Sequence, residues 1–221
     1  MSQAVGGSWT ARDVAGFLRM PTADDDKYSR GVLGVRTGSA EYPGAAVLGI
    51  EAAWRTGLGM VRYLGAARDL VLARRPETVT ADGRVQAWLI GSGTDAASRT
   101  AAETDVLRGI LSGSVPVVVD AGALDLSPGA SAPLVVTPHD REHVRLRDAL
   151  GLGEPGADRA AAAVETARAL NGVMLLKGAQ TLVAEPGGAV VHVGSGIGWL
   201  ATAGTGDVLA GAVGALIAAG C

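Results

Sequence analysis

Residues 86–120 read QAWLIGSGTDAASRTAAETDVLRGILSGSVPVVVD, and this stretch decides the fold class. It opens with the apolar run Gln86 to Ile90, turns at a glycine-rich segment, passes through helix-compatible residues 97–111 and closes with the apolar run Val115 to Val119. Short continuous apolar runs are typical of strands that are buried on both faces. A strand, a helix and a second strand in this order predict a βαβ unit of a parallel sheet.

The same alternation extends along the chain on both sides of this unit. Further strands are expected at Val32 to Val35, Met60 to Leu64, Leu134 to Thr137, Val173 to Leu176, Thr181 to Ala184 and Ala189 to Val193. Further helices are expected at Ala45 to Arg55, Glu142 to Leu150 and Ala157 to Leu170. The last two strands, joined by Pro186-Gly187-Gly188, are expected to form an antiparallel hairpin. The sequence predicts an α/β fold over residues 1–221 as a single domain, with a mostly parallel doubly wound sheet and helices on both faces.

Composition excludes several classes of protein. The chain has 221 residues, 48% of them hydrophobic, and a formal net charge of -3, which argues against an electrostatic nucleic-acid binder. Cys221 is the single cysteine, so no intrachain disulfide is possible. The first 17 residues do not resemble a signal peptide, and the uncharged stretch from Val208 to Cys221 falls short of the about 20 residues of a membrane span. We therefore expect a cytoplasmic protein with no membrane partner, and a homo-oligomer because that Gly/Ala-rich helix favours self-association.

The loop Leu200-Ala201-Thr202-Ala203-Gly204-Thr205-Gly206-Asp207 carries the strongest chemical signal, because an apolar helical run follows it directly. Its glycines allow a tight turn, and a helix N-terminus offers unpaired N–H groups that favour an anion such as a phosphoryl group. Asp207 has two interpretations. It either complements the helix dipole as an N-terminal carboxylate, or it removes a proton from a substrate hydroxyl while the loop holds the transferring phosphoryl group.

Two other loops follow expected strands. Lys177-Gly178-Ala179-Gln180-Thr181 places one of the chain's two lysines at a strand end, where it can reach nucleotide phosphates or lie solvated in a turn. Thr137-Pro138-His139, with Glu142 three residues further on, either places an imidazole near a ligand or simply opens a helix. Neither spacing decides between its two interpretations.

One signal competes with the phosphoryl-transfer interpretation. Gly91-Ser92-Gly93-Thr94-Asp95-Ala96 fits the G-x-G-x-x-A dinucleotide fingerprint, and the following strand ends at Asp120, which could then bind a ribose. A lone glycine fingerprint is a weak signal. The sequence contains no Walker A lysine motif and no Cys/His zinc spacing, so we assign no P-loop and no metal-ligand residues.

Taken together, these loops resemble the ADP-dependent NAD(P)H-hydrate dehydratase family of the ribokinase-like superfamily. Its motifs match, in order, Lys27-Tyr28-Ser29-Arg30-Gly31, Gly38-Ser39, Tyr42-Pro43-Gly44-Ala45-Ala46, Thr56-Gly57-Leu58-Gly59-Met60-Val61-Arg62, Gly91-Ser92-Gly93, Asp120-Ala121-Gly122-Ala123-Leu124, Thr137-Pro138-His139, Lys177 to Thr181 and Leu200 to Asp207. Departures are Asp140-Arg141 after the histidine, where the family more often has Pro-Gly, and Ser92, where it often has proline.

The resemblance implies an enzyme that uses ADP or ATP, with Mg²⁺, to dehydrate the S epimer of hydrated NADH or NADPH. By this likeness Asp207 is catalytic and contacts the substrate, and Gly204, Thr205 and Gly206 form the anion hole. Ala45, Gly93 and His139 contact the dinucleotide substrate. The nucleotide site is lined by Lys177, Gly178, Ala179, Gln180, Thr181 and Gly206.

The family usually continues well beyond the helix that starts near Asp207, whereas this chain stops at Cys221. The resemblance therefore implies a ribokinase-like fold that is truncated at its C-terminus. A ribokinase-like kinase that acts on a small vitamin or sugar alcohol explains Gly204 to Asp207 equally well. It gives no reason for the motifs Lys27 to Gly31 and Tyr42 to Ala46.

Overall fold

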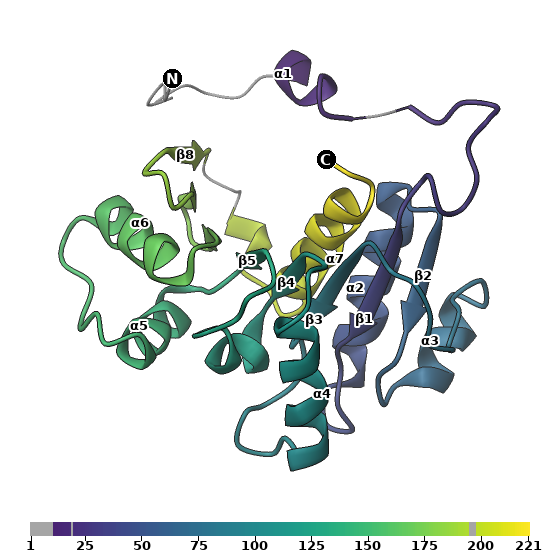
Figure 1. Ribbon diagram of the computed structural model, residues 1–221, viewed down its shortest axis with the longest axis horizontal. Helices are drawn as coiled ribbons and strands as arrows, with labels where there is room; N and C mark the ends of the chain where they lie inside the picture. Colours follow the sequence, from purple (N-terminus) through teal and green to yellow (C-terminus); the bar gives the residue numbers. More distant parts are fainter. Residues whose placement is uncertain (1–10, 19, 195–197) are drawn as a thin grey trace.

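A single mixed sheet organises the part of the chain that the structure describes. The computed structural model describes residues 11–18, 20–194 and 198–221. Most of the first 17 residues, which are not expected to be a signal peptide, therefore lie outside the described residues. Within these residues the sheet has eight strands in the order β2-β1-β3-β4-β5-β6-β7-β8 (Figure 1). Neighbours from β2 to β6 are parallel, and the pairs β6–β7 and β7–β8 are antiparallel.

The strands agree with those expected from the sequence. They are β1 (Val32–Arg36), β2 (Met60–Tyr63), β3 (Ala87–Ile90), β4 (Val117–Val119), β5 (Leu134–Val136), β6 (Val173–Leu176), β7 (Thr181–Ala184) and β8 (Val190–Val193). The expected antiparallel hairpin is confirmed as the β7–β8 pair. These runs were recognisable because most strands in the middle of the sheet are buried on both faces, which requires apolar side chains at successive positions.

The helices differ more from the expectation. They are α1 (Ala11–Ala15), α2 (Pro43–Thr56), α3 (Arg68–Arg74), α4 (Ala101–Leu111), α5 (Asp140–Ala149), α6 (Arg159–Leu170) and α7 (Thr205–Ala218), with short 3₁₀ helices η1 (Ala121–Leu126) and η2 (Gly198–Leu200). The helix expected from residue 97 begins four residues later, because the Thr100 side chain accepts a hydrogen bond from the Glu103 N–H and caps it. Helix α3 was not expected, and Val71 is its one buried residue.

Helices cover both faces of the sheet, as a doubly wound fold requires. On one face α2 and α7 pack side by side over the β1–β3 region, with Ile50 of α2 and Ala210 of α7 in the same apolar core as Leu89 of β3 (Figure 1). On the other face α4, α5 and α6 pack against β3 to β7, with Leu107 and Leu146 in the second core. Among the described residues, none of the helices combines the length and the apolar character that crossing a bilayer requires.

The α2–α7 contact depends on glycine. A Cβ atom added to Gly211 of α7 would overlap the carbonyl oxygen of Gly49 of α2, and one added to Gly49 would lie 3.3 Å from the carbonyl oxygen of Asp207. The two backbones therefore touch without intervening side chains. This close approach fixes where α7 begins relative to the sheet.

We expect Gly211→Ala to lower the free energy of unfolding by roughly 1–3 kcal/mol, because the new methyl group forces two helix backbones apart. Urea unfolding followed by circular dichroism measures the change. Gly109→Ala is the matched control, since Gly109 lies inside α4 and an added Cβ would meet no atom within 4 Å. This control should gain about 0.5–1 kcal/mol from helix propensity. Equal effects at both glycines would contradict the packing argument.

A second buried contact joins α5 to α6. His143 is 2% exposed, and its Nε2 lies 2.8 Å from Thr166 Oγ1. Burial and the nearby Arg147 guanidinium lower the pKa of His143 from 6.5 to about 4, a shift that the Asp140 carboxylate opposes and the Arg159 guanidinium reinforces. Between these two values the unfolded chain binds a proton that the folded chain does not bind. Stability should therefore fall as the pH falls from about 6.5 toward 4.

We expect His143→Gln to remove most of this pH dependence, which amounts to about 3 kcal/mol at most. The measurement is the free energy of unfolding at pH 7 and pH 4.5 for the wild-type chain and for each variant. His192→Gln changes an exposed histidine on β8 and serves as the control. A loss of stability on acidification that is the same in all three chains would show that other groups are responsible.

Candidate active site

Four consecutive strand ends meet at one edge of the sheet. Ser92 follows β3, Asp120 follows β4, Thr137 follows β5 and Lys177 follows β6. The parallel register aligns Ile90 with Val119 and Val119 with Val136, so the residues that follow these strands are almost level. In open α/β sheets, ligands bind beyond the carboxyl ends of the strands, and α7 begins at this edge.

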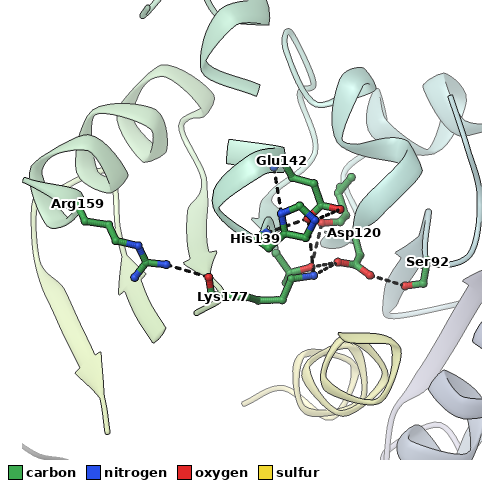
Figure 2. A network of polar contacts seen from close by, with 8 residues as sticks. Ser92, Asp120, His139, Glu142, Arg159 and Lys177 are labelled. Carbon is green, nitrogen blue, oxygen red and sulfur yellow. Dashed lines mark hydrogen bonds and ion pairs between the residues drawn. The ribbon is translucent and has the colours of Figure 1, made fainter. Parts of the chain in front are cut away.

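Asp120 lies at the centre of this edge. The residue is 2% exposed, and its carboxylate accepts hydrogen bonds from Ser92 Oγ to Oδ2 at 2.9 Å and from Lys177 Nζ to Oδ1 at 2.7 Å (Figure 2). A third hydrogen bond comes from Thr137 Oγ1 to Oδ1 at 2.7 Å. Each donor comes from a different strand end. From the sequence, Asp120 is expected to bind a ribose if the glycine fingerprint binds a dinucleotide cofactor, and it also begins the family motif Asp120 to Leu124.

The ribose interpretation of Asp120 is not supported by this geometry. A carboxylate that is buried and already accepts three hydrogen bonds has little surface left for a ribose. In addition, the turn after Gly93 does not open a helix directly, because α4 begins only at Ala101. The glycines serve close packing instead: a Cβ added to Gly91 would overlap the carbonyl oxygen of Asp120.

Lys177 points from the end of β6 toward the start of α7. Its Nζ lies 2.7 Å from Asp120 Oδ1 and 4.0 Å from Glu142 Oε2, and it would lie 3.4 Å from a Cβ added to Gly206. The lysine interpreted as either solvated or ligand-facing is thus partly buried and paired. Its ammonium group is adjacent to the expected anion hole.

The first turn of α7 has the features of an anion site. Gly204 is the N-cap with φ 90°, a left-handed conformation that favours glycine, and no side chain caps this end. The Val208 N–H bonds to the Gly204 carbonyl, whereas the N–H groups of Gly206 and Asp207 have no hydrogen-bond acceptor among the described residues. Such free donors at a helix N-terminus attract negatively charged oxygens.

Asp207 is half-buried in this first turn. Burial raises the pKa of its carboxyl, the nearby Asp120 carboxylate raises that pKa further, and the Lys177 ammonium opposes the shift. No hydrogen-bond donor to the Asp207 carboxylate is found in the described part of the chain. A carboxylate with a raised pKa and no donor retains the capacity to accept a proton, which a general base requires.

His139 and Glu142 form a capping box at the start of α5. His139 Nδ1 accepts from the Glu142 N–H at 3.2 Å, and Glu142 Oε2 accepts from the His139 N–H at 2.8 Å (Figure 2). The helix therefore begins at Asp140, two residues earlier than expected. A helix does open at this segment, but His139 caps it, whereas the expected Thr137 hydroxyl donates to Asp120 instead. The His139 ring is also half-exposed at the site edge, so a ligand can still reach it.

Arg159 of α6 was missed by sequence reasoning and shapes the loop after β6. Its guanidinium donates to the Lys177 carbonyl oxygen at 2.8 Å (Figure 2). It also donates to the Gln180 carbonyl oxygen at 2.6 Å and pairs with Asp140 at 2.8 Å. Gly178, Ala179 and Gln180 are exposed, and Thr181 begins β7. An arginine clamp on backbone carbonyls leaves no trace in the sequence pattern.

Two of the expected substrate contacts lie together at a separate part of this edge. A Cβ added to Gly93 would overlap the Cβ of Ala45, which is in the first turn of α2. Gly93 has φ 64°, so a side chain there would also strain the backbone. The structure thus gathers Lys177, Gly206 and Asp207 at one point, and Gly93 and Ala45 at another.

Protein ligands for a metal are sparse. The described residues contain no group of three or more His, Cys, Asp or Glu side chains that could hold a metal ion. Of the three nearby carboxylates, Asp120 and Glu142 are engaged with donors of their own, and Asp207 is the one with no donor among the described residues. These residues do not fit a metal ion caged by the protein.

Comparison with known proteins gives a consistent family. The family model described as NAD(P)H-hydrate dehydratase matches residues 33–220. The bifunctional NAD(P)H-hydrate repair enzyme of Mycobacterium tuberculosis is 46% identical over 224 residues, which cover 95% of this chain and 46% of that protein. The ADP-dependent (S)-NAD(P)H-hydrate dehydratase of Neisseria meningitidis is 38% identical over 219 residues, which cover 89% of this chain and 72% of that protein. The chain thus spans about half the length of its mycobacterial relatives.

Solved structures confirm the expected ribokinase-like fold. The ADP/ATP-dependent NAD(P)H-hydrate dehydratase of Bacillus subtilis, co-crystallised with ATP and Mg²⁺, aligns with a TM-score of 0.81 and 29% identity, covering 96% of this chain and 85% of that one. A ribokinase-like superfamily protein of Enterococcus faecalis aligns with a TM-score of 0.76 at 24% identity, a likeness in fold alone.

Proposed function

This chain belongs to the NAD(P)H-hydrate dehydratase family, and on that premise we propose that it dehydrates the S epimer of NADH or NADPH hydrate with ADP or ATP. The observation that carries the proposal is the first turn of α7. It combines free N–H groups, the neighbouring Lys177 ammonium and the half-buried Asp207 carboxylate. Together these groups can bind a phosphoryl group and accept the proton of the hydroxyl that attacks it.

The proposed reaction has two parts. In the first, Asp207 takes the proton of the hydrate hydroxyl while the hydroxyl oxygen attacks the terminal phosphoryl group of the nucleotide. The phosphoanhydride bond of the nucleotide breaks. In the second, the lone pair of the ring nitrogen expels the phosphate from carbon, and loss of a ring proton restores the reduced nicotinamide. With ATP, the hydrate gives NAD(P)H, ADP and phosphate. With ADP, it gives NAD(P)H, AMP and phosphate.

The chain's own groups act on charge and position in this scheme. The N–H groups of Gly206 and Asp207 would stabilise the transferring phosphoryl oxygens, and Gly204 and Thr205 shape the turn that presents them. Lys177 would bind the phosphates, with Gly178, Ala179, Gln180 and Thr181 lining the rest of the nucleotide site. Ala45, Gly93 and His139 would contact the dinucleotide substrate. These roles are proposals by likeness to the family.

Mg²⁺ is the proposed companion of the nucleotide, as in the ATP/Mg²⁺ co-crystals of the Bacillus relative. Because the described residues offer no cage for the ion, it would be carried on the nucleotide phosphates and would neutralise part of their charge. No step above depends on a protein ligand to the metal.

A small-molecule kinase of the same fold is the second candidate, favoured by the same Gly204–Asp207 loop. A coupled assay separates the two. The S-epimer hydrate is incubated with ADP or ATP, and recovery of the reduced-nicotinamide absorbance is followed. Recovery supports the dehydratase, whereas phosphorylation of an alcohol without recovery would support the kinase.

We predict that Asp207→Asn removes turnover, by about 10²–10⁴-fold, because it removes the proton acceptor. Binding of ATP with Mg²⁺, measured by calorimetry, should remain, since the asparagine keeps the shape of the first turn. Asp105→Asn, which removes the same charge from an exposed position of α4, is the control. Near-normal turnover in Asp207→Asn would exclude this residue as the base.

The raised pKa of Asp207 predicts the acid limb of the pH profile. A general base works only when deprotonated, so kcat/KM should rise with pH through the pKa of Asp207, above its ordinary value of 3.8. Initial rates between pH 4 and pH 8 give this limb. An activity that stays flat down to the ordinary aspartate pKa would speak against the assignment.

We also propose a homo-oligomer in the cytoplasm, with no nucleic-acid partner. Light scattering after size exclusion gives the mass of the particle in solution.

A further inference from the structure

We propose that Asp120 is a positioning residue that holds the Lys177 ammonium beside Gly206, at the N-terminus of α7. The inference rests on the proposed function only in treating this place as a nucleotide site. Asp120 would not touch the nucleotide or the substrate. It would act through Lys177.

The first argument is electrostatic. The N-terminus of a helix carries a partial positive charge, so a cation placed there is repelled. Lys177 Nζ nevertheless lies near the first turn of α7, 3.4 Å from where a Cβ of Gly206 would be. The Asp120 carboxylate, 2.7 Å from Nζ, supplies the attraction that offsets this repulsion. Glu142 Oε2, at 4.0 Å, adds a weaker attraction.

The second argument is geometric. A lysine side chain has a flexible four-carbon stem, and its ammonium group imposes little direction of its own. The Asp120 carboxylate is itself fixed, because it is buried and the hydroxyls of Ser92 and Thr137 each donate to it from a neighbouring strand end. A fixed acceptor determines where the ammonium group rests before any ligand arrives. Such preorganisation lowers the cost of binding an anion.

The third argument separates Asp120 from the proton acceptor. Two carboxylates lie near the start of α7, but Asp120 accepts hydrogen bonds from three donors, whereas Asp207 is half-buried and has no donor in the described ranges. A buried carboxylate that already accepts three hydrogen bonds is a poor proton acceptor for a substrate. Its charge instead stabilises Lys177.

The first test needs no ligand and uses the fact that the chain has only two lysines, Lys27 and Lys177. The protein is treated briefly with an amine-acetylating reagent, and modification of each lysine is quantified by mass spectrometry. We expect Asp120→Asn to raise the rate at Lys177 severalfold relative to Lys27, because the released side chain becomes more accessible to the reagent. An unchanged ratio overturns the proposal.

The second test is a double-mutant cycle on the binding of ATP with Mg²⁺, with Asp120→Asn, Lys177→Ala and the double variant. Asp120→Asn has two opposing effects: it removes a negative charge from an anion site, and it releases Lys177. We expect the release to dominate and to weaken ATP binding about tenfold. In the Lys177→Ala background the same substitution should leave ATP binding unchanged or strengthen it.

The cycle distinguishes positioning from a general structural role. If Asp120 only supports the fold, its substitution weakens binding equally in both backgrounds, and the proposal fails. Tighter ATP binding in the single variant also overturns it. Asp105→Asn controls for net charge.

A second variant covers the case in which Asp120→Asn does not fold. Thr137→Val removes a donor to Oδ1 of Asp120, and the ratio of acetylation at Lys177 to that at Lys27 should still rise. An unchanged ratio in this variant counts against the proposal.

The two tests also separate this inference from the proposed function. If the wild-type chain does not bind ATP, the nucleotide-dependent function fails, while the acetylation ratio still decides whether Asp120 holds Lys177. If ATP binds and the ratio does not change, the function stands and the positioning role is rejected.

Discussion

The buried carboxylate of Asp120 is the constraint on which the rest of the site depends. A charge that is 2% exposed is tolerated only with partners, and its three donors come from the ends of β3, β5 and β6. Satisfying this one group therefore brings three loops together with the end of β4. The same interaction brings a cation to the start of α7.

The second constraint is the contact between α2 and α7. Because Gly49 and Gly211 allow the two backbones to touch, α7 lies directly on the sheet beside α2. Its first turn, where the N–H groups of Gly206 and Asp207 have no acceptor among the described residues, then lies beside Lys177. The apolar core and the anion site are thus positioned by the same helix.

Much of the fold was predictable from local sequence. Buried strands such as Val173–Leu176 appear as continuous apolar runs, and the hairpin turn is marked by Pro186-Gly187-Gly188. Helix α3 was missed because it buries a single residue, and the start of α4 was misplaced because Thr100 caps it. Periodicity alone does not contain this information.

The site was predictable only where a loop has its own signature. The glycines and the carboxylate of Gly204 to Asp207 indicate an anion site because their chemistry is local. The roles of Asp120 and Arg159 could not be foreseen from spacing, because they depend on contacts across many residues: 57 separate Lys177 from Asp120, and 18 separate Arg159 from Lys177. These contacts, and the burial of Asp120, belong to the tertiary structure.

The Ser92–Asp120–Lys177 chain of hydrogen bonds also joins two loops that face different proposed ligands. Ser92 precedes Gly93, a proposed contact of the dinucleotide substrate, and Lys177 opens the loop that is proposed to bind the nucleotide. A shift of either loop alters the hydrogen bonding of the other through one shared group. Affinity coupling between two sites is equal in both directions. If nucleotide binding raises the affinity for the substrate through these hydrogen bonds, substrate binding therefore raises the affinity for the nucleotide by the same factor.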